Sequence, residues 1–272
     1  MKAAWLSCGE PNSSILCNYL FLNIFLKLVM RKNQLGQPVG SPLPEWKPLA
    51  PPPRETLSGR YCRIEPLNAA QHAANLFAGN ALDASGAGWT YLTVGPFAHF
   101  EEYQHWMQSV CPGNDPLFQA IIDVKSQKAV GVASYMRIDG KVGAVEVGHI
   151  KYTPLMQRTP IATEAMFLMM QQVFTLGYRR YEWKCDSYNA PSRAAAQRLG
   201  FSYEGLFRQA AVYKGRNRNT AWFSIIDSEW PALRDAYTRW LAPENFTADS
   251  QQRQSLSALT APLLKRSDTG DA

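Results

Sequence analysis

The chain has 272 residues, of which 46% are hydrophobic, and a formal net charge of +6 at pH 7. A chain of this length and hydrophobic content can bury the core of one domain of ordinary size. The mild positive charge suits a phosphate-bearing ligand. Lysine and arginine are spread along the chain, and no helix-turn-helix, metal-knuckle or RNA-binding signature occurs, which argues against a nucleic-acid-binding protein.

Cysteine occurs five times, an odd number, and no CxxC pair is present. This usage argues against a disulfide framework and against a zinc site. We therefore expect no bound metal and a reducing, cytoplasmic compartment. Cys185 falls in a predicted strand, where we interpret it as a small buried hydrophobic residue.

Residues 15–30 are apolar but are interrupted by two asparagines and a lysine. The segment is shorter than the roughly twenty residues of a membrane helix, and no small-residue cleavage site follows it. One alternative is a weak signal anchor. The alternative that we favour is that translation starts at Met30 and that residues 1–29 are a non-native or flexible extension, so we expect no membrane attachment.

Residues 30–56 form a proline-rich arm, which favours an extended, polyproline-like backbone. We expect the arm to lie across the domain that follows, held by Trp46 and Leu49. A ligand for an SH3-type partner is the alternative. The domain itself is expected over residues 57–242.

The first half of this domain shows alternating strand patterns and helical periodicity. The predicted elements are a strand over 61–65, a helix from Asn68 to Ala78, a helix over 100–110, and a hairpin of strands 118–124 and 130–138.

A further strand is predicted over 142–152, with a carboxylate in its middle. Alternation places Val145 and Val147 on one face and Glu146 on the other. A carboxylate in a partly buried sheet is unusual unless it is paired or catalytic. Two interpretations of Glu146 stay open: an ion pair with a neighbouring arginine or lysine, and a catalytic role.

The run from Gln157 to Ala165 joins this strand to a helix that ends near Gly177. Its apolar face consists of Ala162, Ala165, Met166, Met169, Met170, Val173 and Phe174. A turn that leads straight into a helix presents free backbone N–H groups at the positive end of the helix dipole. That geometry binds phosphate, so the sequence predicts a phosphate site at this turn.

A second strand and turn follow over residues 181–192. Tyr181, Trp183 and Cys185 alternate with charged residues, and Asn189 and Pro191 mark the start of a short helix that ends at Gly200. A strand–helix–strand unit of this kind implies a local parallel pair, with both turns at the carboxyl ends of their strands.

The end of the chain is predicted to hold two strands, over 211–214 and 220–226, and a closing helix over 233–241. Residues 243–272 are rich in Ser, Thr, Gln and Asp, so we expect a mostly disordered tail. Within it, residues 256–264 could form a marginal helix.

The order of these motifs, over about residues 57–241, resembles the GNAT superfamily of acyl-CoA-dependent N-acetyltransferases and is most similar to its RimJ/RimL-like branch. The residues that carry the resemblance are Glu146, the runs 157–165 and 189–192, the sequence 198–201, the segments 89–92 and 95–97, and the late segment 214–222. The resemblance implies an α/β fold with a mostly antiparallel central sheet, a local parallel strand pair and flanking helices.

The resemblance also implies roles for individual residues. The turn would hold the pyrophosphate of acetyl-CoA, with Asn189 orienting the cofactor or the intermediate. Glu146 would be the general base, acting directly or through water, and Ser192 the acid that protonates the leaving thiolate. The cofactor-binding residues of the turn would be Gln157, Arg158, Thr159, Ile161, Ala162 and Thr163.

Two features of this sequence qualify those roles. Pro160 stands where the family usually has glycine, so one N–H donor is lost, and Arg158 could compensate through its guanidinium. Ser192 could cap its helix instead of acting as an acid, with Tyr188 as the runner-up acid. Tyr91 and Phe97 would border the acceptor, although ordinary core packing explains them equally well.

The sequence therefore predicts an enzyme that moves an acetyl group from acetyl-CoA to a primary amine of a small molecule or a protein N-terminus, as a monomer or homodimer. A non-catalytic acyl-CoA-binding module and an interaction protein that uses the proline arm are the alternatives.

Overall fold

The computed structural model describes residues 32–248 and 251–270. The chain divides into two compact units, Met1–Lys47 and Pro48–Ala272. In the described part of the first unit, an isolated bridge joins Lys32 and Pro38. The second unit contains the sheet and the helices that follow. The expectations for residues 1–29 lie outside the described residues. No helix of the described residues is long and apolar enough to cross a membrane.

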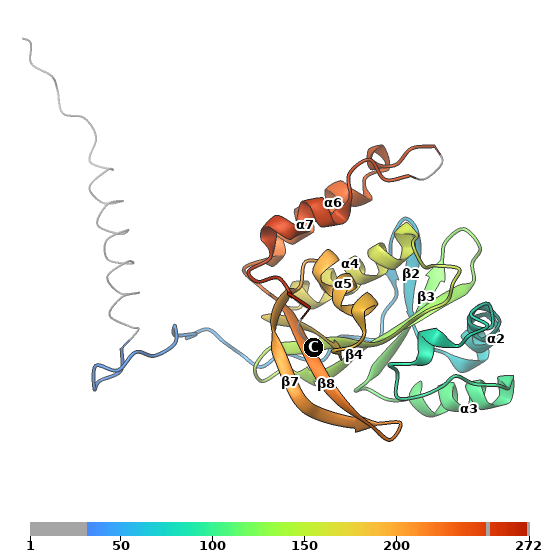
Figure 1. Cartoon of the computed structure of the whole chain (residues 1–272). Coiled ribbons are helices and arrows are strands. Elements are labelled where there is room, and N and C mark those ends of the chain that lie inside the picture. Colours follow the sequence, from blue (N-terminus) through green and yellow to red (C-terminus); the bar gives the residue numbers. More distant parts are fainter. Residues whose placement is uncertain (1–31, 249–250, 271–272) are drawn as a thin grey trace, which may run out of the picture. The chain divides into compact units, whose positions relative to one another are not determined.

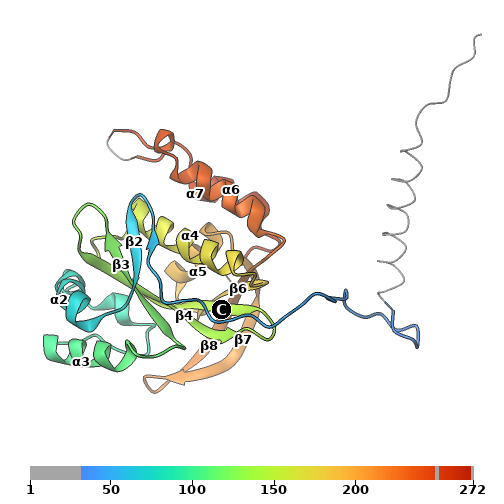
Figure 2. The same cartoon turned by 180° about the vertical axis from the view of Figure 1, so that it is seen from behind.

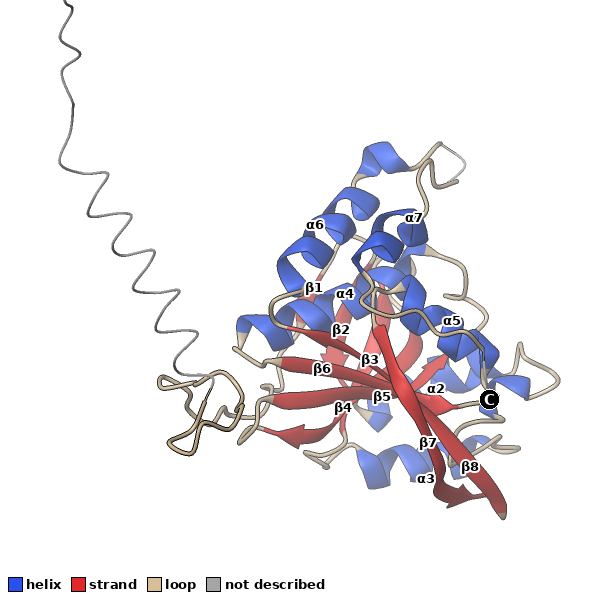
Figure 3. Ribbon diagram, turned by 60° about the vertical axis from the view of Figure 1, so that its left-hand side comes forward, coloured by secondary structure: helices blue, strands red, loops and turns tan. Residues whose placement is uncertain are grey.

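The second unit is built on one eight-stranded sheet (Figure 3). In spatial order the strands are β1 (Leu57–Ser58), β2 (Cys62–Pro66), β3 (Leu117–Asp123), β4 (Ala129–Asp139), β5 (Ala144–Tyr152), β6 (Arg180–Asp186), β8 (Arg216–Ile226) and β7 (Ser202–Tyr213). Neighbouring strands are antiparallel except β5 and β6, which are parallel. This mostly antiparallel sheet with one local parallel pair confirms the fold class predicted from the sequence.

Helices cover the two faces of the sheet (Figures 1 and 2). The helices α2 (Ala69–Asn80) and α3 (Phe100–Val110) pack on one face, where they share a core with Phe118, Ala120 and Ile122 of β3. The other face carries α4 (Pro160–Thr175), α5 (Ala190–Arg198), α6 (Trp230–Leu241) and α7 (Leu256–Thr260). Short 3-10 turns lie at Ala87–Trp89, Pro243–Asn245 and Ala261–Leu263.

The helix α4 forms where the periodicity predicts it. Its methionines Met166, Met169 and Met170 and its Val173 are fully buried in the larger core, and Gly177 follows the helix with the left-handed φ of +91° that favours glycine. The methionines therefore serve as core packing. Asn68 likewise caps α2, because its side chain accepts a hydrogen bond from the amide of Gln71.

Residues 48–56, the part of the arm that belongs to the second unit, are held there by contacts just before β1. The Leu49 amide donates to the carbonyl of Gly140 at 2.9 Å, and its side chain packs against the larger core. The Tyr178 hydroxyl donates to the carbonyl of Ala50 at 3.0 Å. The predicted anchoring role of Leu49 is thus confirmed.

Two sequence expectations at the end of the chain need correction. The strand β7 begins at Ser202, well before residue 211, and its outer half is largely exposed on both faces, so it lacks the alternation that would reveal it. Residues 251–270 are not a loose tail: Leu256 is fully buried, and the carboxylate of Asp268 forms an ion pair with Arg193. A few anchoring contacts order a segment whose overall composition is polar.

Candidate active site

The strands β5 and β6 pair over only part of their length. Their parallel register runs from Ala144–Arg180 to Val147–Trp183 and then stops, although β5 continues to Tyr152 and β6 to Asp186. Beyond that point β5 still pairs with β4, and β6 with β8. His149, with a φ of +47°, lies at an irregularity of β5 just after the last pair. Backbone donors and acceptors on the facing edges are therefore available to a ligand.

The turn after β5 leads directly into α4. Thr159 is the N-cap residue but makes no side-chain cap bond, because its hydroxyl donates to the carbonyl of Met156 at 2.7 Å. Pro160 is the first helical residue, so the amides of Ile161 and Ala162 carry the unpaired N–H groups of the first turn. Gln157 stabilises the turn, because its side-chain NH2 group donates a hydrogen bond to the backbone carbonyl of Tyr152 at 3.1 Å.

A carboxylate holds the start of α4 in place. Glu164 is buried and accepts hydrogen bonds from three consecutive backbone amides of the turn between β1 and β2. The distances are 2.8 Å from Arg60, 2.6 Å from Tyr61 and 2.8 Å from Cys62. The first turn of α4 is thereby fixed to the turn between β1 and β2 and to the start of β2, which keeps the N–H groups of the helix start in place.

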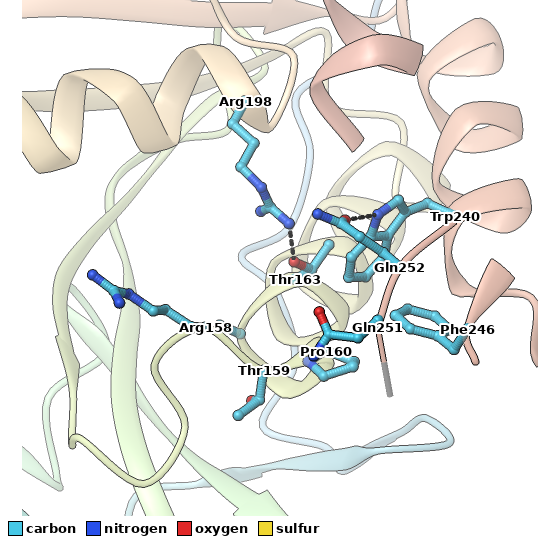
Figure 4. Close-up of a pocket in the computed structure, with 10 residues that line it drawn as sticks. Arg158, Thr159, Pro160, Thr163, Arg198, Trp240, Phe246, Gln251 and Gln252 are labelled. Atoms are coloured by element: carbon cyan, nitrogen blue, oxygen red, sulfur yellow. Dashed lines mark hydrogen bonds between the residues drawn. The ribbon is translucent and has the colours of Figure 1, made fainter. Parts of the chain in front are cut away.

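A cavity of about 450 Å³ opens at this helix start (Figure 4). Arg158, Thr159, Pro160, Ala162 and Thr163 line one side of it, and binding of phosphate at this turn stays a prediction. The opposite side comes from Arg198 at the end of α5, Trp240 at the end of α6 and the C-terminal residues 246, 251 and 252. Sequence reasoning assigned no role to this second wall.

Arg198 brings a second positive charge to the cavity. Its guanidinium donates to the hydroxyl of Thr163 at 3.0 Å, and it forms no ion pair with any residue of the described ranges. Burial lowers the pKa of Arg198. A half-buried guanidinium without an acidic partner is costly unless an anion approaches it, so the cavity favours anionic ligands.

Glu146 is placed on the paired part of β5, and its side chain is only 4% exposed. One carboxylate oxygen lies 2.7 Å from Arg137, and the other lies 2.9 Å from Lys184, which also contacts Glu182 at 2.7 Å. The ion pair that was one of the two interpretations is therefore present. The role of Glu146 as a base stays a prediction.

The turn before α5 brings three of the predicted residues together. Asn189 is the cap of α5, because its side-chain oxygen accepts from the amide of Ser192 at 3.2 Å. The hydroxyl of Ser192 accepts from the indole N–H of Trp183 at 3.0 Å, so Ser192 does not cap the helix with its side chain. Tyr188, next to Asn189, is 67% exposed.

The two predicted acceptor residues have different surroundings. The Tyr91 hydroxyl donates to the carbonyl of Tyr188 at 2.9 Å, which joins the loop before α3 to the turn before α5. Phe97 packs in a ring cluster, with its centroid 5.3–5.5 Å from those of Trp89, Tyr103 and Trp106. Core packing therefore accounts for Phe97, whereas Tyr91 lies beside a candidate catalytic residue.

Sequence reasoning gave no role to Asp186, which lies beside this turn. Asp186, at the end of β6, accepts from the Tyr188 amide and from the Tyr213 hydroxyl, both at 2.9 Å. Burial and then the hydrogen bond to Asp186 raise the pKa of Tyr213 to about 12. This pair fixes β7 to the turn before α5. Asp186 could have been identified from its position at the carboxyl end of β6, where ligands commonly bind next to a parallel strand pair.

Comparison with known proteins places this arrangement in a family. Residues 63–202 match the model of the acetyltransferase (GNAT) domain. A GCN5-related N-acetyltransferase from Brucella melitensis has a crystal structure with 50% sequence identity and a TM-score of 0.79, over 80% of this chain and 100% of that one. A probable GNAT-family acetyltransferase from Chromobacterium violaceum is 39% identical with a TM-score of 0.67, over 72% of this chain and 98% of that one.

Among curated proteins, the uncharacterized N-acetyltransferase p20 of Bacillus licheniformis is 26% identical over 145 residues, which cover 52% of this chain and 80% of that protein. The matched domain spans the strands and helices that form the opening and the turn. The chain is therefore an acetyltransferase of the GNAT family.

Proposed function

We propose that this protein transfers an acetyl group from acetyl-CoA to a primary amine of a small molecule or a protein N-terminus. The observation that carries the proposal is the opening between β5 and β6. It leads to the start of α4, where backbone N–H groups are unpaired, and to the cavity whose arginines favour an anionic ligand. A long ligand with an acyl end and a phosphate end matches the two halves of this arrangement. When bound, acetyl-CoA supplies an acyl group already activated as a thioester.

The residues of the turn fit a pyrophosphate. The amides of Ile161 and Ala162 point along the helix axis toward the ligand side, where the helix dipole also favours negative charge. Pro160 contributes no donor, and Arg158 would supply a charged one. The side-chain oxygen of Asn189 is used by its cap, so its contact with the cofactor would come from its NH2 group.

Amine attack on a thioester requires the loss of a proton, and Glu146 would accept it. Both carboxylate oxygens already contact cations, and the side chain is nearly inaccessible. The proton would therefore reach Glu146 through water rather than directly from the amine. Exposed backbone amides at the edge of β5 would stabilise the oxyanion, and the thiolate would leave with a proton from Tyr188 or Ser192.

Turnover of acetyl-CoA against a panel of free amines and peptides tests the function, with calorimetry of CoA alongside. We expect CoA to bind and at least one class of primary amine to be acetylated. Binding of CoA without turnover of any amine would instead favour the non-catalytic module. Failure to bind CoA would reject the proposal.

The leaving-group acid can be assigned by comparing Tyr188→Phe with Ser192→Ala. We expect Tyr188→Phe to lower kcat by about 100-fold, because its exposed side chain is available to the thiolate. Ser192→Ala is expected to lower kcat by less than about tenfold, because the half-buried Ser192 hydroxyl hydrogen-bonds the thiol of Cys185 in addition to accepting from the indole of Trp183. Steady-state kinetics at saturating acetyl-CoA measures both. A larger loss for Ser192→Ala would assign the acid to Ser192.

Finer features of the proposal rest on the sequence. The segments 89–97 and 214–222 support membership of the RimJ/RimL-like branch. The odd number of cysteines and the lack of a CxxC pair support the proposed cytoplasmic location. Tyr91 remains the residue that we place beside the acceptor, because it contacts the turn of Tyr188.

A further inference from the structure

The segment that follows α7, residues 261–270, lies outside the matched family domain and yet reaches the turn before α5. The family domain ends at residue 202. The segment passes along α5 (Figure 3), where the amide of Asp268 donates to the side-chain oxygen of Gln197 at 2.8 Å. Nearer to α7, the amide of Lys265 donates to the hydroxyl of Ser202 at 2.9 Å. These contacts carry the side chain of Asp268 to the start of α5.

A buried ion pair joins this segment to α5. The carboxylate of Asp268 accepts two hydrogen bonds from the guanidinium of Arg193, at 2.6 Å from Nε and 2.5 Å from Nη2. The two side chains are only 3% and 9% exposed, and the bond to Arg193 lowers the pKa of the Asp268 carboxyl. Because a two-pronged pair fixes the plane of the guanidinium, its third nitrogen is also fixed. That nitrogen, Nη1, donates to the backbone carbonyl of Ser187 at 2.9 Å.

The Ser187 carbonyl belongs to the peptide group that joins Ser187 to Tyr188. The N–H of the same peptide group donates to the carboxylate of Asp186 at 2.9 Å, so both of its polar atoms are held by side chains. The carbonyl of Tyr188 in turn accepts from the hydroxyl of Tyr91 at 2.9 Å. Since peptide groups are planar, these bonds fix the backbone on both sides of Tyr188. The direction in which its 67% exposed side chain leaves the backbone is therefore fixed as well.

We propose that Asp268 is a positioning residue for acetyl transfer, acting through Arg193 on the peptide group that precedes Tyr188. The inference rests on the proposed function, in which the Tyr188 hydroxyl gives its proton to the leaving thiolate. An exposed side chain on a loose turn would sample many directions, and only a few of them are productive. The ion pair restricts this sampling before the substrates bind. Asp268 itself touches neither substrate, so its effect belongs in kcat rather than in binding.

Asp268→Asn tests the proposal with a side chain of nearly the same shape. Asparagine turns an NH2 group toward the guanidinium in place of one oxygen, so Arg193 loses its fixed orientation. We expect kcat to fall about tenfold, a part of the roughly 100-fold loss expected without the acid. The KM values for acetyl-CoA and for the amine should change by less than about twofold. Asp268→Glu keeps the carboxylate and should recover part of the lost rate.

A double-mutant cycle with Tyr188→Phe separates positioning from a general loss of structure. If Asp268 acts through the Tyr188 hydroxyl, Asp268→Asn should lower kcat by less than about twofold once that hydroxyl is absent. Thermal unfolding checks that each variant is folded. If the asparagine variant does not fold, the same cycle is measured with Asp268→Glu.

Ser255→Ala is the matched control in the C-terminal part of the chain. The Ser255 side chain accepts from the amide of Ala258 at 3.2 Å and thereby caps α7. Its loss should lower the thermal stability but leave kcat unchanged, because Ser255 has no contact with the turn before α5.

The outcomes separate this inference from the proposed function. A kcat of Asp268→Asn within about twofold of the wild-type value would overturn the inference and leave the acetyltransferase proposal standing. An equal fall of kcat with and without the Tyr188 hydroxyl would also overturn it, because the effect would then not pass through Tyr188. A wild-type protein that acetylates no amine would reject the proposed function and this inference together.

Discussion

Replacement of Glu146 by glutamine is expected to slow acetyl transfer by about 100- to 10,000-fold, the range for loss of a general base, while CoA binds almost as before. Glutamine keeps the size of the side chain but cannot accept the proton. Glu146 lies on the paired part of β5, outside the set of residues that line the cavity, so CoA affinity should be insensitive to it. Single-turnover kinetics and calorimetry measure the two quantities separately.

Glu182→Gln is the matched control for this experiment. Glu182 lies opposite Glu146 on the neighbouring strand and shares the ammonium group of Lys184, at 2.7 Å against 2.9 Å for Glu146. If Glu146 serves only the ion-pair network, the two substitutions should have similar effects on turnover. If Glu146 is the base, Glu182→Gln should retain most of the activity. Equal turnover of Glu146→Gln and the wild-type protein would reject the base.

The two cationic partners of Glu146 differ in their exposure to solvent, and this difference affects how a proton could reach the carboxylate. The side chain of Lys184 is 8% exposed, and its ammonium lies 3.7 Å from the ring centroid of Trp222. That of Arg137 is 59% exposed. An exposed ion pair contributes little to stability and exchanges readily with water. Water would therefore replace Arg137, rather than Lys184, as a partner of the Glu146 carboxylate. A chain of water molecules that carries the proton from the amine would reach Glu146 from the side of Arg137.

Local patterns were enough to predict most of the central fold. The apolar spacing of α4, the cap at Asn68 and the strand–helix–strand order around residues 144–186 each depend on neighbours in sequence. The helix start that forms one side of the cavity follows from the same information. The parallel pairing of β5 and β6 could be predicted because a helix connects the two strands.

The opposite wall of the cavity could not be predicted in this way. Arg198 and Trp240 are 42 positions apart, and each has an ordinary local role at the end of a helix. Their contact depends on how α5 and α6 pack over the sheet. The spacing of residues within each helix does not predict that packing. The order of the C-terminal segment has a similar origin, because Leu256 and Asp268 find their partners far away in the sequence.

Replacement of Glu164 by alanine is expected to lower the free energy of unfolding by about 2–4 kcal/mol, because three backbone amides lose their acceptor in a partly buried turn. Gly59 lies so close to this carboxylate that a side chain there would collide with it, so the glycine leaves the space that the Glu164 carboxylate occupies. Glutamine at position 164 should cost less, because it keeps one accepting oxygen but turns an NH2 group toward the same donors.

Urea denaturation measures these differences, with Gln171→Ala as the control on the exposed face of α4. We expect the control to change stability by no more than about 0.5 kcal/mol, as for a surface substitution without special contacts. Because Glu164 ties the first turn of α4 to β2, its loss should also weaken CoA binding under conditions where the variant remains folded. Wild-type stability in Glu164→Ala would show that water satisfies the three amides and that the carboxylate is not what fixes the phosphate turn.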